Sequence, residues 1–302
     1  MKAYSKLIGH LAVFFAYAIF GFNIIVCKDL SNMHLISPLG LFCCRSIGAT
    51  ALFWLISLFM PKEKVDVKDL GKIFIASMLG LFFTQMTFLE AIKITTPLDT
   101  SIITATTPIF TMFVAAIALK EPITLKKAGG VALSFIGVVF LILNTVSVTG
   151  NGVTETKPLG LVLMLCNCLC FASYLGIFRP LIAKYNVVTF MKWMFLFSML
   201  VSVPLNIKEM THLPFEQMNT TYILELGFLI LCATFIAYFL VPIGQKRIRP
   251  TVVSLYAYLQ PLIATVMSIY LGMDRLSWQK VVAAILVFTG VILVNKSRAA
   301  AS

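Results

Sequence analysis

Long apolar stretches recur along the whole chain, and they limit the folds that it can adopt. Of its 302 residues, 60% are hydrophobic and only 12% are charged. A run of about 18 or more apolar residues is long enough to cross a bilayer as a helix. Backbone N–H and C=O groups in lipid must bond to one another, so only helices and closed barrels span a membrane. The runs lack the alternation of barrel strands. The sequence therefore predicts an all-α polytopic membrane protein.

We expect ten transmembrane helices, with ends placed to within a few residues. The predicted ranges are 7–27, 35–59, 70–92, 97–119, 125–145, 159–180, 187–205, 222–245, 250–272 and 278–295. A polar segment that contains Gly150, Asn151 and Gly152 separates the fifth range from the sixth. This segment divides the chain into two five-helix units, 1–150 and 151–302.

The distribution of basic residues predicts the orientation of the ten helices. Six basic residues fall on the side opposite the amino terminus, namely Lys28, Lys93, Lys157, Lys208, Arg275 and Lys280. Arg45 falls within a predicted helix, which leaves 17 of the 24 basic residues on the amino-terminal side. Because Lys and Arg gather in cytoplasmic loops, both termini are predicted to be cytoplasmic. Five helices per half give the halves opposite orientations, which is the inverted repeat typical of alternating-access transporters.

Two of the predicted helices carry a pair of prolines with the same spacing. Pro97 and Pro108 are eleven residues apart, and Pro250 and Pro261 repeat this spacing 153 residues later. Pro108 and Pro261 are predicted to kink their helices near the middle of the membrane, where each frees one backbone carbonyl. Lipid cannot satisfy such a carbonyl, so we expect both kinks to face protein or a wet cavity.

Other positions match at the same shift of 153 residues. Glu121 corresponds to Asp274, and Gly137 corresponds to Gly290. Proline kinks are common in membrane helices, and either kink alone is ordinary. Four coincidences at one shift predict a genuine internal repeat.

Polar residues inside the predicted helices are candidates for substrate binding, because such residues are costly in a bilayer unless they serve a function. The candidates are Asn23, Arg45, Gln85, Thr104, Tyr174, Tyr238, Tyr256 and Gln260. The alternative for the neutral members is a hydrogen bond between helices or ordinary packing. Gln85 and Tyr238 are 153 residues apart, so a two-fold axis between the halves would bring them together.

Two ionisable residues have more specific candidate roles. Arg45 can bind a carboxylate through two parallel hydrogen bonds. The alternatives are an ion pair with Glu90 or Asp99, or an extended side chain that reaches the outer surface. Glu90 is a candidate for proton coupling, although a carboxylate near a helix end also reaches water.

Several function classes lack their sequence signals. Cys166, Cys168 and Cys170 are spaced like metal ligands, but helical neighbours two residues apart point in roughly opposite directions. The chain contains no H-E-x-x-H, G-x-S-x-G or phosphate-loop motif. Its net charge of +12 is scattered among short loops, which fits a bilayer better than a nucleic acid. We therefore expect no metal, no cofactor, no nucleic acid and no enzymatic activity.

The repeated pattern Pro-x10-Pro-x12-acid-x15-Gly and the run FGFNIIVCK, which ends at Lys28, resemble the drug/metabolite transporter superfamily. The resemblance is specifically to its EamA-type ten-helix members and covers nearly the whole chain. It implies an inner-membrane secondary transporter, usually an exporter of amino acids or other small metabolites, with a central cavity between the two halves. The expected partners are a small-molecule substrate and the lipid bilayer, with protons left open, and we expect a monomer or a weak homodimer. A passive channel or facilitator, and a non-transporting sensor or assembly subunit, are the alternatives.

Overall fold

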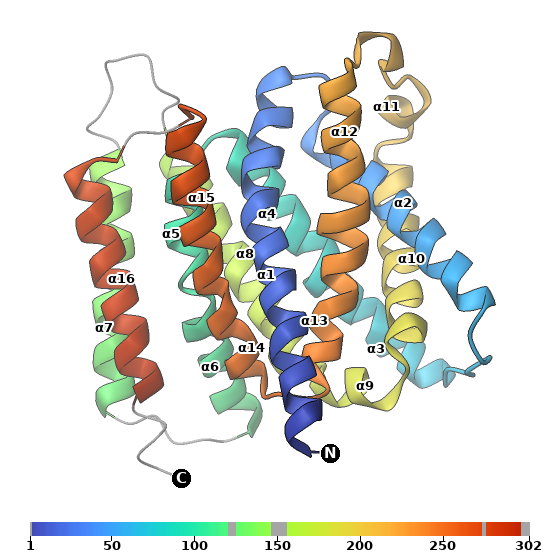
Figure 1. The fold of residues 1–302 in the computed structure, drawn as a ribbon, viewed down its shortest axis with the longest axis horizontal. Helices are drawn as coiled ribbons and strands as arrows, with labels where there is room; N and C mark the ends of the chain where they lie inside the picture. Colours follow the sequence, from blue (N-terminus) through green and yellow to red (C-terminus); the bar gives the residue numbers. More distant parts are fainter. Residues whose placement is uncertain (1, 120–124, 146–155, 274–275, 297–302) are drawn as a thin grey trace.

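The computed structural model describes residues 2–119, 125–145, 156–273 and 276–296, and all the regular structure in this part of the chain is helical (Figure 1). The α-helices are α1 (Lys2–Met33), α2 (Pro38–Leu58), α3 (Val67–Ser77), α4 (Thr84–Lys93), α5 (Pro97–Thr104), α6 (Thr107–Leu119), α7 (Leu125–Thr145), α8 (Pro158–Ile177), α9 (Arg179–Lys184), α10 (Val187–Leu205), α11 (Ile207–Thr211), α12 (Thr220–Phe228), α13 (Ala237–Gln245), α14 (Pro250–Leu255), α15 (Leu259–Tyr270) and α16 (Trp278–Lys296). The shorter elements are η1 (Met78–Phe83), η2 (Phe215–Gln217), η3 (Leu229–Ile236) and η4 (Tyr256–Tyr258).

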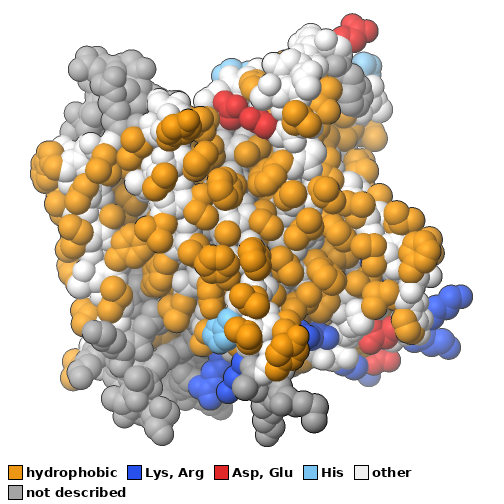
Figure 2. Space-filling model, in the orientation of Figure 1, with side chains coloured by type: hydrophobic (Ala, Val, Ile, Leu, Met, Phe, Trp, Pro, Cys, Tyr) orange, Lys and Arg blue, Asp and Glu red, His pale blue; other side chains and the backbone are white. Residues whose placement is uncertain are grey.

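Seven of the described helical segments are long and apolar enough to cross a membrane. They are Tyr4–Met33, Pro38–Leu58, Val67–Lys93, Pro158–Ile177, Val187–Leu205, Thr220–Gln245 and Val252–Tyr270. Two shorter apolar helices are Ala128–Leu141 and Trp278–Gly290. All ten predicted ranges overlap helices, but three of them do not meet this length and apolarity, so ten spans remain a prediction. Figure 2 shows hydrophobic side chains over most of the displayed face, as a surface in contact with lipid requires.

Two long helical segments contain a π-helix at nearly corresponding positions. In the first, η1 lies between α3 and α4, and in the second, η3 lies between α12 and α13. In each segment a threonine hydroxyl donates to the carbonyl five residues earlier, Thr84 to Leu79 at 2.6 Å and Thr234 to Leu229 at 2.7 Å. The wider π turns leave these carbonyls available, and the hydroxyl groups satisfy them. π turns inside α-helices are frequent at functional sites.

The helix axis is interrupted just before each of the two central prolines. α5 ends at Thr104 and α6 begins at Thr107, directly before Pro108. The Thr107 hydroxyl donates to the carbonyl of Thr104 at 2.6 Å, so this group has a partner despite the proline. Before Pro261, the short 3₁₀ turn η4 separates α14 from α15.

α7 and α16 pack against each other along their length at one side of the molecule (Figure 1). A Cβ on Gly137 would lie 3.0 Å from the carbonyl oxygen of Ala283, and a Cβ on Gly290 would lie 2.4 Å from that of Gly130. Only glycine permits so close an approach of the two backbones. Glu121 and Asp274, the acidic members of the repeated pattern, lie outside the described residues.

α1 begins and α16 ends at the lower edge in Figure 1, which we call the inner edge. The opposite edge, at which α1 ends and α12 begins, is the outer edge. Two clusters of buried apolar side chains fill the described interior. One contains Ile24, Ile92 and Leu98, and the other contains Phe53, Phe190 and Phe195. α1 contributes to both clusters and therefore lies between helices of the two halves.

Candidate functional site

A small chamber lies among α1, α4, α5, α6, α8, α13 and α15. Its volume is about 60 Å³, enough for several water molecules at roughly 10–15 Å³ each. Its polar lining comprises Tyr17, Asn23, Thr84, Gln85, Thr104, Thr107, Asn167, Tyr238 and Gln260. Its apolar lining comprises Phe20, Ile24, Phe88, Met164 and Phe171. Among the described residues, no formally charged side chain lines the chamber.

A hydrogen bond between the two halves crosses this chamber. The Gln85 Nε2 atom donates to the Tyr238 hydroxyl at 2.6 Å, and the two residues are 153 positions apart. The Gln85 Oε1 atom and the Tyr17 hydroxyl are buried without a hydrogen-bond partner in the described structure. Buried polar atoms that lack a partner in the protein are suited to bind water or a ligand. The chamber therefore offers polar atoms that are free to bind a solute.

Five of the eight predicted binding residues lie together in the chamber lining: Asn23, Gln85, Thr104, Tyr238 and Gln260. The other three lie elsewhere. The ring of Tyr174 packs against Gly80 and Phe171, and its hydroxyl is buried without a partner among the described residues. The Tyr256 hydroxyl bonds to the His10 Nδ1 atom at 2.8 Å, near the start of α1.

Arg45 is also outside the chamber lining, and its contacts differ from each predicted alternative. Only 1% of the side chain is exposed, so it does not extend to the outer surface. Its Nε atom donates to the Thr234 hydroxyl at 2.8 Å, and its Nη1 atom lies 3.6 Å from the Cys27 sulfur. None of the ion pairs in the described structure includes Arg45, so the pairs with Glu90 or Asp99 are not formed.

Glu90 occupies a half-buried position on α4. It lines neither the chamber nor the outer cavity described below. Its neighbours Leu89, Ile92 and Lys93 do line that outer cavity, but the Glu90 side chain does not. The geometry gives Glu90 no direct contact with a solute in either cavity, and its role in coupling remains a prediction.

The sequence reasoning missed much of the lining, notably Tyr17, Thr84 and Asn167. The Asn167 side chain donates to the backbone carbonyl of Thr84 at 2.6 Å, and this bond joins α8 to the start of α4. A lone asparagine in an apolar helix was the available signal for this residue. The aromatic members Phe20, Phe88 and Phe171 carried no signal, because an apolar side chain inside a membrane helix is ordinary.

A larger cavity of about 270 Å³, the vestibule, opens at the outer edge. It is bounded by the end of α1, the start of α2, the end of α4, α11 and α12. Its lining includes Ser31, His34, Lys93, Glu209 and Tyr222. The Glu209 carboxylate accepts a hydrogen bond from the backbone N–H of Ser37 at 2.6 Å. Unlike the chamber, the vestibule is therefore lined by charged side chains.

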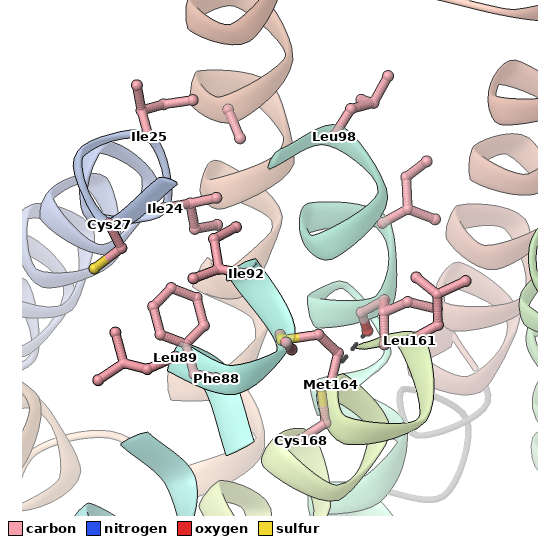
Figure 3. Close-up of a cluster of buried hydrophobic side chains, with 14 of the residues drawn as sticks. Ile24, Ile25, Cys27, Phe88, Leu89, Ile92, Leu98, Leu161, Met164 and Cys168 are labelled. Atoms are coloured by element: carbon pink, nitrogen blue, oxygen red, sulfur yellow. Dashed lines mark hydrogen bonds between the residues drawn. The ribbon is translucent and has the colours of Figure 1, made fainter. Parts of the chain in front are cut away.

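Apolar side chains separate the vestibule from the chamber. Ile24 and Phe88 line the chamber, whereas Cys27 and Leu89, in adjacent positions on the same two helices, line the vestibule. These four side chains belong to one buried apolar cluster, shown in Figure 3 with α1 beside α4. The two cavities are thus stacked along α1 and α4 with a thin apolar barrier between them.

A network of charged and polar groups joins the two halves at the inner edge. Only 7% of the Asp69 side chain is exposed, and its carboxylate contacts Lys184 at 2.6 Å, Lys72 at 3.0 Å and the Tyr185 hydroxyl at 2.8 Å. Lys184 also pairs with the exposed Asp66 at 2.7 Å. The hydrogen bonds that Lys184 donates to these carboxylates raise its pKa above the ordinary value, with Asp66 the largest contributor and Asp69 next. The network ties the start of α3 to the end of α9.

A different ion pair lies at the outer edge. Lys280, at the start of α16, pairs with Asp99 of α5 at 3.2 Å, and the Asp99 side chain is 1% exposed. The Thr156 hydroxyl donates to the other oxygen of Asp99 at 2.5 Å. Asp99 follows the N-cap residue Thr96, whose side chain accepts from the Asp99 backbone N–H at 3.3 Å. These contacts fasten α16 to α5, away from the vestibule.

The chain resembles known transporters in sequence. An uncharacterized transporter of Archaeoglobus fulgidus is 25% identical over 159 residues, which cover 52% of this chain and about half, 53%, of that protein. The uncharacterized transporter YyaM of Bacillus subtilis (strain 168) is 23% identical over 258 residues, which cover 81% of this chain and 80% of that protein.

A solved crystal structure has the same overall fold. It superimposes with a TM-score of 0.65 at 13% identity and covers 98% of this chain and 99% of the other. At this identity the likeness concerns the fold alone. The sequence model of the EamA-like transporter family matches residues 7–143 and again residues 158–296. The match accounts for most of the sequence, and the chain belongs to the EamA-like transporter family.

Proposed function

We propose that the protein is an inner-membrane secondary transporter that exports amino acids or other small metabolites by alternating access. Its halves, 1–150 and 151–302, would be inverted five-helix repeats within a ten-span fold. The chamber residues Asn23, Gln85, Thr104, Tyr238 and Gln260 would contact the substrate. One observation carries this proposal. Segments that correspond between the two halves form an ion pair at the inner edge, whereas at the outer edge they line a cavity.

Contacts between corresponding residues support the repeat. The two family matches begin 151 residues apart, at 7 and 158, and end 153 residues apart, at 143 and 296. Gln85 contacts Tyr238, and the Ser134 hydroxyl donates to the carbonyl of Val287 at 3.0 Å, each pair being 153 positions apart. A residue that touches its own counterpart lies near the two-fold axis that relates two copies. These two contacts therefore support an axis that passes through the chamber and the α7–α16 pair.

The two edges differ where such a repeat would make them alike. A shift of 153 places Asp69 on Tyr222, and a shift of 151 to 153 places Lys184 on residues 31–33. At the inner edge Asp69 and Lys184 are in contact at 2.6 Å. At the outer edge Ser31 and Tyr222 instead line the vestibule. Corresponding segments thus meet through an ion pair at the inner edge and line a cavity at the outer edge, and we propose that this is the outward-facing state of a carrier.

The separation of the two cavities favours a carrier over a passive channel. The chamber is lined by buried side chains of both halves and is divided from the vestibule by Ile24, Phe88 and Leu89. A solute in the vestibule can reach the chamber only if this barrier moves. The chamber must also widen, because about 60 Å³ holds only a few water molecules.

The location of the charged groups supports cytoplasmic termini. On the face drawn in Figure 2, lysine and arginine side chains gather along the lower edge, which is the inner edge. Basic residues are retained on the cytoplasmic side of bacterial membranes. The vestibule would therefore open away from the cytoplasm.

The proposal is tested by flux across a bilayer. Purified protein is first screened by thermal shift against the amino acids and a panel of small metabolites, because stabilisation grows with ligand concentration over Kd. Solutes that stabilise the protein are then followed in proteoliposomes. We expect saturable transport and counterflow. Flux that rises linearly with concentration would indicate a channel, and stabilisation without flux would indicate a sensor.

Gln85→Leu tests whether the chamber is the substrate site. The variant removes the bond to Tyr238 and one buried acceptor, and we expect kcat/KM for transport to fall about tenfold, since a lost buried hydrogen bond costs roughly 1–3 kcal/mol. Ser173→Ala on α8 is the control, because in the described structure the Ser173 hydroxyl bonds to the carbonyl of Leu169 within its own helix. Equal transport by both variants would place the substrate elsewhere.

A further inference from the structure

Arg45 is a charged residue that lies almost fully buried within a predicted membrane helix. Its side chain is 1% exposed, yet it lies seven residues after the start of α2 at Pro38, about 10 Å along the helix at ~1.5 Å per residue. The guanidinium group carries five N–H donors and a permanent positive charge. A buried charge is costly unless an opposite charge and hydrogen bonds compensate it.

The surrounding residues compensate this charge only in part. Thr234 accepts from the Nε atom, and the Cys27 sulfur, a weak acceptor, lies beside the Nη1 atom. The Nη2 atom is buried without a hydrogen-bond partner in the described structure. Glu225 acts electrostatically on Cys27, but it forms no ion pair with Arg45 in the described structure. No carboxylate of the described chain forms an ion pair with Arg45.

Arg45 lines neither cavity itself, but it contacts a residue that lies where the two cavities approach each other. Cys27, its contact on α1, lines the vestibule, and the Cys27 thiol donates to the Asn23 side chain of the chamber at 3.5 Å. Tyr238 of the chamber lies within the electrostatic reach of the guanidinium group. An anionic group that moves from one cavity to the other would therefore pass beside an incompletely bonded positive charge.

The fold shared by the two halves does not require this arginine. A shift of 151 to 153 places Arg45 on residues 196–198 of α10, which are Leu196, Phe197 and Ser198. The corresponding helix thus packs without a buried cation at this position. This difference favours a role in the properties that are particular to this chain, such as the choice of substrate.

We infer that Arg45 binds a carboxylate group of the substrate, so that the protein carries small organic anions or zwitterions whose carboxylate supplies the missing counter-charge. The carboxylate would replace the Cys27 thiol as the partner of Nη1 and would also accept from Nη2, which is the bidentate arrangement that arginine favours. The remainder of the substrate would lie against the apolar walls of the vestibule, formed by Leu30, Leu41 and Leu89. This inference rests on the proposed transport function and specifies its substrate class.

The test compares charged and neutral probes of the same shape on the purified full chain. Thermal unfolding is measured with sodium acetate and sodium benzoate, and with acetamide and benzamide at matched ionic strength. The two carboxylates should raise the Tm of the wild type, and the two amides should not. Arg45→Met should abolish this difference, and Arg45→Lys should retain part of it because the charge remains while the bidentate geometry is lost. Arg179→Met, which removes an exposed arginine, should respond to carboxylates as the wild type does.

A second measurement separates this role from a purely structural one. Without any probe, Arg45→Met should unfold at the same temperature as the wild type or at a higher one, because it removes an uncompensated buried charge. A Tm several degrees lower, or a variant that does not fold, would make Arg45 a structural residue and overturn the inference. A carboxylate effect that is absent from the wild type, or is equal in wild type and Arg45→Met, would also overturn it.

Flux measurements distinguish failure of this inference from failure of the proposed function. Saturable transport of amides, without preference for carboxylates, would leave the carrier intact and refute the role of Arg45. Arg45-dependent binding of carboxylates without flux of any solute would support the site and refute transport.

Discussion

In the proposed repeat, the inner and outer edges of this protein are built from corresponding segments, yet these segments make different contacts. At the inner edge, the carboxylate of Asp69 holds Lys184 and the Tyr185 hydroxyl within 2.8 Å. At the outer edge, Tyr222 and Ser31, which correspond to Asp69 and Lys184, line a cavity of about 270 Å³. The comparison teaches that corresponding segments need not make corresponding contacts. Polar contacts between residues distant in sequence, such as Asp69 with Lys184, distinguish the two edges.

The comparison of the two edges assumes that the halves are held together in the same way along their length. The pairing of α7 with α16, the last helix of each half, provides such a contact. Gly290→Ala should break this pairing, because the added Cβ would lie 2.3 Å from the Ser134 hydroxyl and 2.4 Å from the carbonyl oxygen of Gly130. We expect a loss of about 3 kcal/mol in the free energy of unfolding, typical of overpacking against backbone. The measurement is thermal unfolding in detergent.

Gly129→Ala is the matched control on α7. A Cβ at Gly129 meets no atom within 4 Å. Alanine favours the helix over glycine by about 0.5–1 kcal/mol, so this variant should be slightly stabilised. If both variants unfold at the same temperature, the close approach of α7 and α16 is not needed for stability.

Asp69→Ala should break the closure of the inner edge. The variant removes three hydrogen bonds to one carboxylate. We expect the free energy that favours the closed inner edge to fall by about 2 kcal/mol. This value is smaller than for three fully buried bonds because Lys72 and Lys184 are more than half exposed. This shifts the equilibrium toward inner opening about 30-fold. Opening is reported by a cysteine at position 248, introduced as Ile248→Cys into a protein without the native cysteines. Ile248 is buried in the same apolar cluster as Tyr185. Its labelling by a maleimide should accelerate to a corresponding extent.

Asp66→Ala sharpens this comparison. Asp66 pairs with the same Lys184, but 70% of its side chain is exposed, so the pair contributes little. We expect less than about a twofold change in labelling at position 248. Equal acceleration by Asp66→Ala and Asp69→Ala would mean that net charge, rather than the buried carboxylate, closes the inner edge.

The smallest expected effect is that of pH on the inner edge. Contacts with Asp66 and Asp69 raise the pKa of Lys184 above its unfolded value of about 10.4. The stabilisation from this shift is fully present below that unfolded value and is lost only as pH rises through the raised value. Labelling of Ile248→Cys, normalised to an exposed cysteine, should therefore be constant between about pH 6 and pH 9. A marked acceleration in this range would show that another group controls the closure.

Much of the local structure could be predicted from residue types alone. Thr96 and Pro97 begin α5 because a threonine N-cap followed by proline suits a helix start. The interruptions before Pro108 and Pro261 follow from the missing N–H and the ring of proline. The contact between Gln85 and Tyr238 also follows from the shift of 153, because residues on a two-fold axis meet their counterparts.

The composition of the candidate site was less accessible to sequence reasoning. Asn23 lines the chamber, whereas Tyr174 and Tyr256 do not, although all three are polar residues of apolar helices. The rotation of each helix about its axis decides which face meets the chamber, and this rotation depends on packing with every neighbour. Glycines such as Gly80, which lies against the ring of Tyr174, fix these rotations through contacts that no local pattern encodes.

The sequence by itself determined that the chain forms long apolar helices, where two of these helices are interrupted, and that the two halves share a pattern. These properties depend on local hydrogen bonding, on the geometry of proline and on the exclusion of polar groups from lipid. Only the tertiary structure decided that Arg45 is buried beside two cavities without a carboxylate partner in the described chain, and that the inner edge holds an ion pair while the outer edge holds a vestibule. These outcomes depend on contacts between residues more than a hundred positions apart, such as Asp69 with Lys184 and Arg45 with Thr234. The free energy of each such contact is set by the final packing of all the helices and not by the segment that carries either residue.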